Sequence, residues 1–130
     1  MALLRHEELT YKIIGCALTV HKTLGNGFQE VIHQRSLALE LAKNSILFER
    51  EKEIPIFYNG IEVGTRRADF LVEYKVIVEV KAIIQLDEID LAQALNYLGA
   101  FDLPTGLLIN FGAKSLQFKR LLNKKYGFEP

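Results

Sequence analysis

Apolar residues near the start of the chain recur at intervals of three and four, which is the spacing of an amphipathic helix. The series consists of Leu9, Ile13, Cys16, Ala17, Val20 and Leu24. The segment Gly25-Asn26-Gly27 follows and supplies the backbone freedom that a helix end and a sharp turn require. The sequence therefore predicts a first helix that ends at this turn.

A second helix is predicted from about Phe28 to Lys43. One stripe of this helix contains Glu30, His33 or Gln34, Leu37 and Leu41. Because Glu30 is in line with two leucines, we expect its side chain to lean toward the core and to need a partner there. The alternative is that Glu30 is a first-turn acid that offsets the helix dipole.

From residue 46 the pattern changes to that of strands. Residues 46–58 alternate and contain Pro55, which favours an edge strand or a bulge. Asn59-Gly60 is the strongest short signal for a two-residue hairpin turn. Residues 46–58 are therefore expected to pair antiparallel with residues 61–72.

A β-branched run that carries two charged residues follows at 76–81. The polar break at residues 73–75 would fold this run back against the preceding strand. Because side chains alternate along a strand, Glu79 and Lys81 project from the same face. The antiparallel pairing then brings Asp69 level with Glu79 or Lys81.

Helical spacing returns at residues 86–101, with Asp87 as the expected N-cap. The apolar side of this helix is expected to contain Leu86, Ile89 and Ala92. Gln93 and Tyr97 lie one turn apart on one face.

Residues 105–111 read as a short buried strand, and residues 116–122 as either another strand or a terminal helix. The order ααβββαβ predicts an α/β layered fold with residues 1–130 as a single domain.

The composition supports one compact domain, because 49% of the 130 residues are hydrophobic. The 16 basic residues balance 16 acidic residues, so no bulk positive field attracts nucleic acid. The sequence does not exclude a local basic patch, since the segment from Lys114 to Lys125 has five basic residues and no acidic one.

The single cysteine, Cys16, cannot form an intramolecular disulfide and is expected in the core. The N-terminal residues MALLRHEEL have no signal-peptide pattern, and no apolar run reaches the roughly 18 residues of a membrane span. We therefore expect a cytoplasmic protein without a membrane partner.

Asp69, Glu79 and Lys81 stand among residues that otherwise favour burial. Two carboxylates on a half-buried sheet face suit magnesium, which takes oxygen ligands and is often held by one or two carboxylates plus phosphate oxygens. A lysine beside them would position a water or stabilise negative charge on phosphate. The alternative is an ordinary Glu–Lys pair on a solvated face. The histidines have no close metal-ligand spacing and favour surface or packing roles.

Asp69, followed after nine residues by Glu79-Val80-Lys81, resembles the bipartite active-site motif of the PD-(D/E)xK nuclease superfamily. Gln93-x-x-x-Tyr97 resembles the helix motif of the RecB-like branch of that superfamily. The chain also resembles the small GxxExxY family, through segments that occur in the same order: 27–30, 58–60, 67–69, 93–98 and 108–112. His33 stands where that family has tyrosine, and Ala68 where the motif expects proline.

The resemblance implies a restriction-endonuclease-like core, with a mixed central sheet flanked by helices. Asp69, Glu79 and the backbone carbonyl of Val80 would hold Mg²⁺ or Mn²⁺ in this core. Lys81 would orient the attacking water.

The resemblance also implies roles for three residues on helices. Glu30 would join the catalytic group, and Gln93 and Tyr97 would contact phosphate or buttress the site. From the residues alone, Gln93 and Tyr97 could equally make a capping or core hydrogen bond.

These features predict a metal-dependent nuclease that hydrolyses phosphodiester bonds of DNA or RNA. The alternative is a catalytically silent module of the same fold that binds nucleic acid or a protein partner. The neutral net charge of the chain is compatible with this alternative. The retention of Asp69, Glu79 and Lys81 together argues against it. The sequence does not decide the oligomeric state, so a homodimer, or a larger assembly that supplies the contacts to the substrate, is also an alternative.

Overall fold

The computed structural model describes residues 6–126. Its elements are α1 (Glu7–Leu24), α2 (Glu30–Lys43), β1 (Phe48–Tyr58), β2 (Ile61–Val72), β3 (Val76–Lys81), α3 (Glu88–Phe101), β4 (Thr105–Asn110) and β5 (Gln117–Leu122). The predicted order is confirmed up to β4. The last segment, for which strand and helix were both open, forms a strand.

The strands form one mixed sheet in the order β1-β2-β3-β4-β5. β3 and β4 are parallel and are connected through α3, whereas the other neighbouring pairs are antiparallel. The predicted α/β fold with a mixed central sheet is confirmed. β1 is an edge strand, as Pro55 indicated, and the register of its pairing shifts between Ile56 and Phe57.

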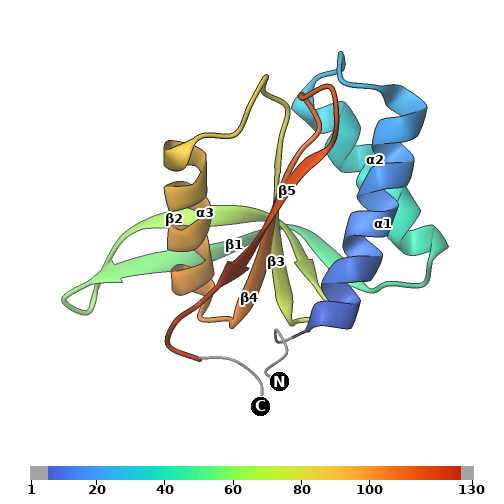
Figure 1. Ribbon diagram of the computed structural model, residues 1–130. Coiled ribbons are helices and arrows are strands. Elements are labelled where there is room, and N and C mark those ends of the chain that lie inside the picture. Colours follow the sequence, from blue (N-terminus) through green and yellow to red (C-terminus); the bar gives the residue numbers. More distant parts are fainter. Residues whose placement is uncertain (1–5, 127–130) are drawn as a thin grey trace.

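The two faces of the sheet are covered by different helices (Figure 1). α1 and α2 pack on one face, where Val78 and Val80 belong to the larger apolar core. α3 covers the other face, where Ile77 and Leu108 are buried. This separation confirms the predicted alternation along β3, and it leaves Glu79 and Lys81 on the α3 side.

Turn chemistry sets the local boundaries. α1 ends at Gly25, whose φ of 76° is costly for residues with a Cβ atom. Asn59 and Gly60 also have positive φ values, 51° and 78°, as a two-residue hairpin turn with the twist of its strands requires. Asp87 caps α3, because its side chain accepts from the N–H groups of Ile89 and Asp90.

Two details of the helices differ from expectation. α2 begins at Glu30 rather than near Phe28. Glu30 is exposed in the first turn of the helix, as the alternative of a first-turn acid predicted, and does not lean into the core. The buried side of α3 contains Ala94 and Leu98, whereas Ile89 is 68% exposed. Apolar residues surround much of this helix, so its own pattern does not decide which side faces the sheet.

β2 and β3 separate partway along their length. Their pairing comprises Val72–Val76, Leu71–Ile77 and Phe70–Val78. Beyond that point β2 continues with β1 as a hairpin that extends past α3, while β3 continues along β4 (Figure 1). Asp69 and Glu79 are the first residues past the last pair, so both lie at this fork.

Candidate active site

Asp69 occupies the gap between the separating strands. Its Oδ2 atom accepts a hydrogen bond of 2.7 Å from the backbone N–H of Val80, which takes the place of a ladder bond between β2 and β3. Its Oδ1 atom accepts a bond of 2.9 Å from the side-chain amide of Gln34 on α2. These two contacts fix the carboxylate at the fork.

Gln34 is itself held by a third residue. Arg50 on β1 donates to the Oε1 atom of Gln34 at 2.9 Å. Because arginine can only donate, this bond turns the amide so that its NH₂ group faces Asp69. This chain of contacts was not predicted from the sequence, although the position of Gln34 on the inward stripe of α2 was a signal.

Glu79 lies directly beside Asp69 and is only 7% exposed. The pKa of Glu79 is raised to about 9, first by burial and then by the negative charge of Asp69 and a hydrogen bond with it. Burial also raises the pKa of Asp69, against the lowering effect of the Val80 N–H. Within residues 6–126 the Glu79 Oε1 atom is buried and has no hydrogen-bond partner. The site therefore contains a buried carboxyl oxygen that no protein group satisfies within the described residues.

Lys81 and Glu30 complete the charged group. Burial raises the pKa values of Asp69, Glu79 and Glu30, and the positive charge of Lys81 opposes part of this rise. The pKa of Glu30 is raised, by burial first and then by the charge of Asp69. Glu30 thus faces the fork from the first turn of α2, although it is not in the core.

The other predicted site residues lie farther out. Gln93 is exposed on α3, and Tyr97 is half-buried and lines a separate cavity next to the β1–β2 hairpin. Neither makes a hydrogen bond to Asp69, Glu79 or Lys81 in the described chain.

Asn110, at the end of β4, holds the backbone that follows Lys81. Its Oδ1 atom accepts from the N–H groups of Ile83 and Gly112, and its amide donates to the Ile83 carbonyl and to the Gln117 side chain. Asn110 is fully buried, and all four bonds are 2.9–3.0 Å long. Because this clamp begins two residues after Lys81, it fixes the exit of β3 and with it the site.

Gly112 lets the clamp close, because a methyl group there would overlap the backbone of Ala82 and Ile83. We expect Gly112→Ala to lower the free energy of unfolding by about 1–3 kcal/mol, the usual cost of overpacking. Chemical denaturation measures this change. Gly99→Ala is the control, since a methyl group at Gly99 meets nothing within 4 Å and removing a helical glycine should stabilise α3. Equal effects of the two substitutions would contradict the close approach at Gly112.

His33 is a packing residue. It is fully buried, its ring stacks on Phe111 at 4.7 Å, and burial followed by the charge of His21 lowers its pKa. Both ring nitrogens lack a hydrogen-bond partner in the part of the chain that the structure describes. The predicted packing role of this histidine is confirmed.

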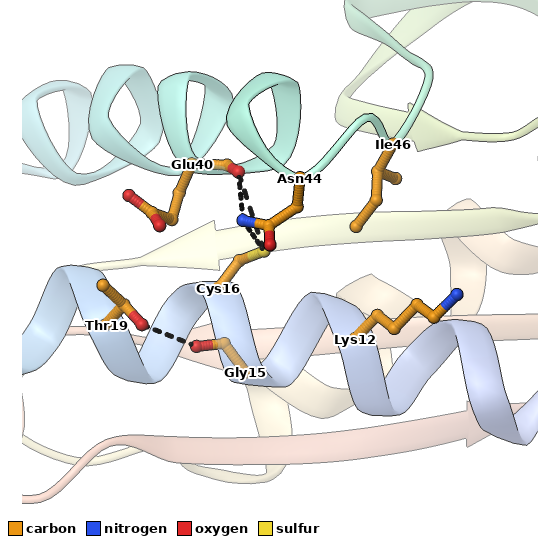
Figure 2. Close-up of a pocket in the computed structure, with 7 residues that line it drawn as sticks. All are labelled: Lys12, Gly15, Cys16, Thr19, Glu40, Asn44 and Ile46. Atoms are coloured by element: carbon orange, nitrogen blue, oxygen red, sulfur yellow. Dashed lines mark hydrogen bonds between the residues drawn. The ribbon is translucent and has the colours of Figure 1, made fainter.

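A second cavity, of about 320 Å³, lies between α1 and α2, away from the fork (Figure 2). Cys16 lines it, and the Asn44 amide bonds to the Cys16 Sγ atom at 3.6 Å and to the Glu40 carbonyl at 2.8 Å. Burial raises the pKa of the Cys16 thiol, which disfavours the reactive thiolate. The prediction of Cys16 as a core residue is confirmed.

The basic run at residues 114–125 is partly engaged within the molecule. Lys125 forms an ion pair of 2.9 Å with Asp102, and Arg120 lies over the ring of Tyr11. Lys114, Lys119 and Lys124 are exposed. The run is therefore a weak anchor for nucleic acid by itself.

A mixed sheet with helices on both faces, and an Asp-Glu-Lys group at the fork of two central strands, defines a restriction-endonuclease-like α/β core. The family model of the PD-(D/E)XK nuclease superfamily matches residues 7–121, so the chain belongs to that superfamily. Nucleases of this superfamily typically use divalent metal ions.

Similarity to a solved structure agrees with this fold. The crystal structure of SSO0001 matches with a TM-score of 0.56 and 18% sequence identity, over 92% of this chain and 60% of that chain. At this identity the similarity shows the fold alone, and the chain spans about 60% of the length of that protein. No curated protein matches the sequence. Between residues 6 and 126, no helix is long and apolar enough to cross a membrane.

Proposed function

We propose that this protein is a metal-dependent phosphodiester hydrolase that cleaves DNA or RNA, and that it is a cytoplasmic member of the GxxExxY branch. One observation carries the proposal. The buried carboxyl of Glu79 has an unpartnered oxygen beside Asp69, with Lys81 close enough to affect the pKa of both. A packing role would not favour keeping a carboxylic acid there, because an unpaired buried polar atom destabilises the fold.

The donor set fits Mg²⁺ or Mn²⁺. Asp69, Glu79 and the Val80 carbonyl would supply oxygen ligands, and magnesium commonly keeps waters and binds phosphate oxygens at its remaining positions. No group of three or more His, Cys, Asp or Glu side chains able to hold a metal occurs in the described residues. This sparse set suits a cation that shares its coordination with substrate better than a structural zinc ion, which needs four protein ligands.

When bound, the cation would stabilise negative charge on a phosphate oxygen and favour ionisation of a water. The protein's own residues do the rest. Gln34 and the Val80 N–H hold Asp69 in place, and the Asn110 clamp fixes the strand that bears Glu79 and Lys81. The Lys81 ammonium orients the attacking water and stabilises charge that develops on the phosphate.

Three further residues have supporting roles in this proposal. Glu30 accepts a proton or a water hydrogen bond at the mouth of the fork, where its raised pKa eases protonation. Gln93 and Tyr97 lie one turn apart on α3 and would contact the substrate when it is bound.

A cleavage assay with Mg²⁺ or Mn²⁺ on single- and double-stranded DNA and RNA tests this function. Wild type is expected to cleave at least one of the four substrates, and Asp69→Asn is expected to lose at least about a hundredfold in rate. Asp102→Asn is the control, because Asp102 is an exposed aspartate whose carboxylate contacts Lys125 and Tyr126. Cleavage that survives in Asp69→Asn, or that persists in a chelator, would refute the proposed site. Binding by wild type without cleavage of any substrate would favour the silent module.

A further inference from the structure

A cavity of about 370 Å³ lies between α3 and the β1–β2 hairpin, and we call it the hairpin groove. The hairpin contributes Ile56, Val63 and Arg66 to its lining, and α3 contributes Asn96 and Tyr97. An apolar wall, an aromatic ring and a few polar groups are the usual composition of a small-ligand site, and the volume is at the lower end of the range for such sites.

Arg66 gives the hairpin groove its charge. Its side chain makes only one hydrogen bond within residues 6–126, a long one of 3.5 Å to the Thr65 carbonyl, and pairs with no carboxylate there. The neighbouring Arg67 points to the opposite face of β2 and is neutralised by Glu51 and Glu53 at 3.3 and 3.5 Å. The groove therefore offers an uncompensated guanidinium, which suits a phosphate group.

The position of the hairpin groove connects it with the candidate active site. Arg66 precedes Asp69 by three residues of the same strand, about 10 Å at the rise of a β-strand. The groove lies on the α3 side of the sheet, and the alternation along β3 directs Glu79 and Lys81 to that same side. A nucleic-acid strand with one phosphate at Asp69 and Glu79 would therefore place a neighbouring nucleotide in the groove.

The size of the hairpin groove and the apolar tip of the hairpin favour an unpaired base. The cavity has room for one nucleoside, whereas a base pair would be too large, and a base can enter such a pocket only when it has left the duplex stack. At the hairpin tip, Phe57 and Tyr58 are 60% and 69% exposed. Exposed aromatic rings of this kind are stacking surfaces for single-stranded bases.

We propose that the hairpin groove binds one unpaired nucleotide next to the scissile phosphate, with Arg66 on a phosphate and the base between Tyr97 and the apolar wall. This inference rests on the proposed function for the position of the scissile phosphate. It assigns the enzyme to single-stranded or frayed nucleic acid, DNA or RNA, rather than to intact duplex.

The test compares Arg66→Ala with Arg67→Ala by fluorescence anisotropy, using labelled DNA and RNA hexanucleotides in calcium. Both arginines are exposed, and both variants lose one positive charge from adjacent positions, so general electrostatics would affect them equally. We expect Arg66→Ala to weaken binding at least tenfold and Arg67→Ala to change it less than twofold. The DNA and RNA arms decide which sugar is preferred, and a blunt duplex is expected to bind at least tenfold more weakly than the better single strand.

Equal effects of the two substitutions, equal affinity for the blunt duplex, or no binding of any hexanucleotide by wild type would overturn the groove assignment. The same holds if Tyr58→Ser dissociates a dimer in sedimentation while hexanucleotide affinity is unchanged, since the hairpin would then be a subunit interface. Cleavage of the hexanucleotides by wild type in Mn²⁺ reports on the proposed function separately. If binding depends on Arg66 but wild type cleaves nothing, the nucleotide site in the groove is supported and the proposed hydrolase function is refuted. If wild type cleaves the hexanucleotides but Arg66→Ala and Arg67→Ala weaken binding equally, the hydrolase function is supported and the nucleotide site is refuted.

Discussion

Replacing Lys81 with alanine is expected to slow metal-dependent cleavage at least about a hundredfold, or about 2.7 kcal/mol in the activation barrier. The ammonium acts on the attacking water and on charge that develops at the phosphate, so its contribution is concentrated in the transition state. Affinity for the same oligonucleotide in calcium should fall only a few-fold. Single-turnover cleavage and anisotropy on one preparation give both quantities.

Lys75→Ala is the control for Lys81→Ala. Lys75 is an exposed lysine in the turn before β3, at the opposite end of that strand. It should leave both the rate and the affinity near the wild-type values. If Lys81→Ala reduces affinity as much as rate and flattens the salt dependence of binding, Lys81 is one phosphate contact among several, and the catalytic role is wrong.

Glu79→Gln is expected to remove the pH dependence that the buried Glu79 carboxyl gives to the free energy of unfolding. The pKa of Glu79 is about 9 in the folded chain against 4.5 in the unfolded chain, so the folded state holds a proton that the unfolded state releases. The stabilising contribution is fully present below pH 4.5 and is lost as the pH rises through 9. We expect wild type to lose stability over this window, on the order of a few kcal/mol. Denaturation of metal-free protein at several pH values measures the loss.

A cation should replace that proton. In wild type, Mg²⁺ or Mn²⁺ should therefore raise Tm by several degrees, and more at pH 8 than at pH 6. Glu79→Gln should lose most of this response. Glu40→Gln, near the C-terminal end of α2 and beside the other cavity, should keep it. A metal response that is the same in wild type and Glu79→Gln would show that the cation binds elsewhere.

Much of the fold could be predicted because the signals are local. The spacing of apolar residues predicted α1 and α2, and Asn59-Gly60 predicted the turn that pairs β1 with β2. The period of two along β3 placed Glu79 and Lys81 on one face. Each of these features depends on neighbours within a few residues, which the sequence contains in full.

Other features depend on contacts between distant segments. Residues 117–122 became a strand because β4 offered a free edge, and α3 turned Ala94 and Leu98 inward because those residues met the sheet. Glu30 was expected to lean toward the core, but the late start of α2 leaves it at the mouth of the fork.

The sequence by itself determined which charged residues meet, because strand period and turn chemistry bring Asp69, Glu79 and Lys81 into one place. Only the tertiary structure determined how deeply those charged groups are buried and which hydrogen bonds support them. The separation of β2 from β3 opened the gap that Asp69 fills, and burial beside it raised the pKa of Glu79. Packing across the sheet placed Gln34 and Asn110 as the supports of the site. Desolvation and long-range hydrogen bonds depend on the whole fold, and no short stretch of sequence specifies them.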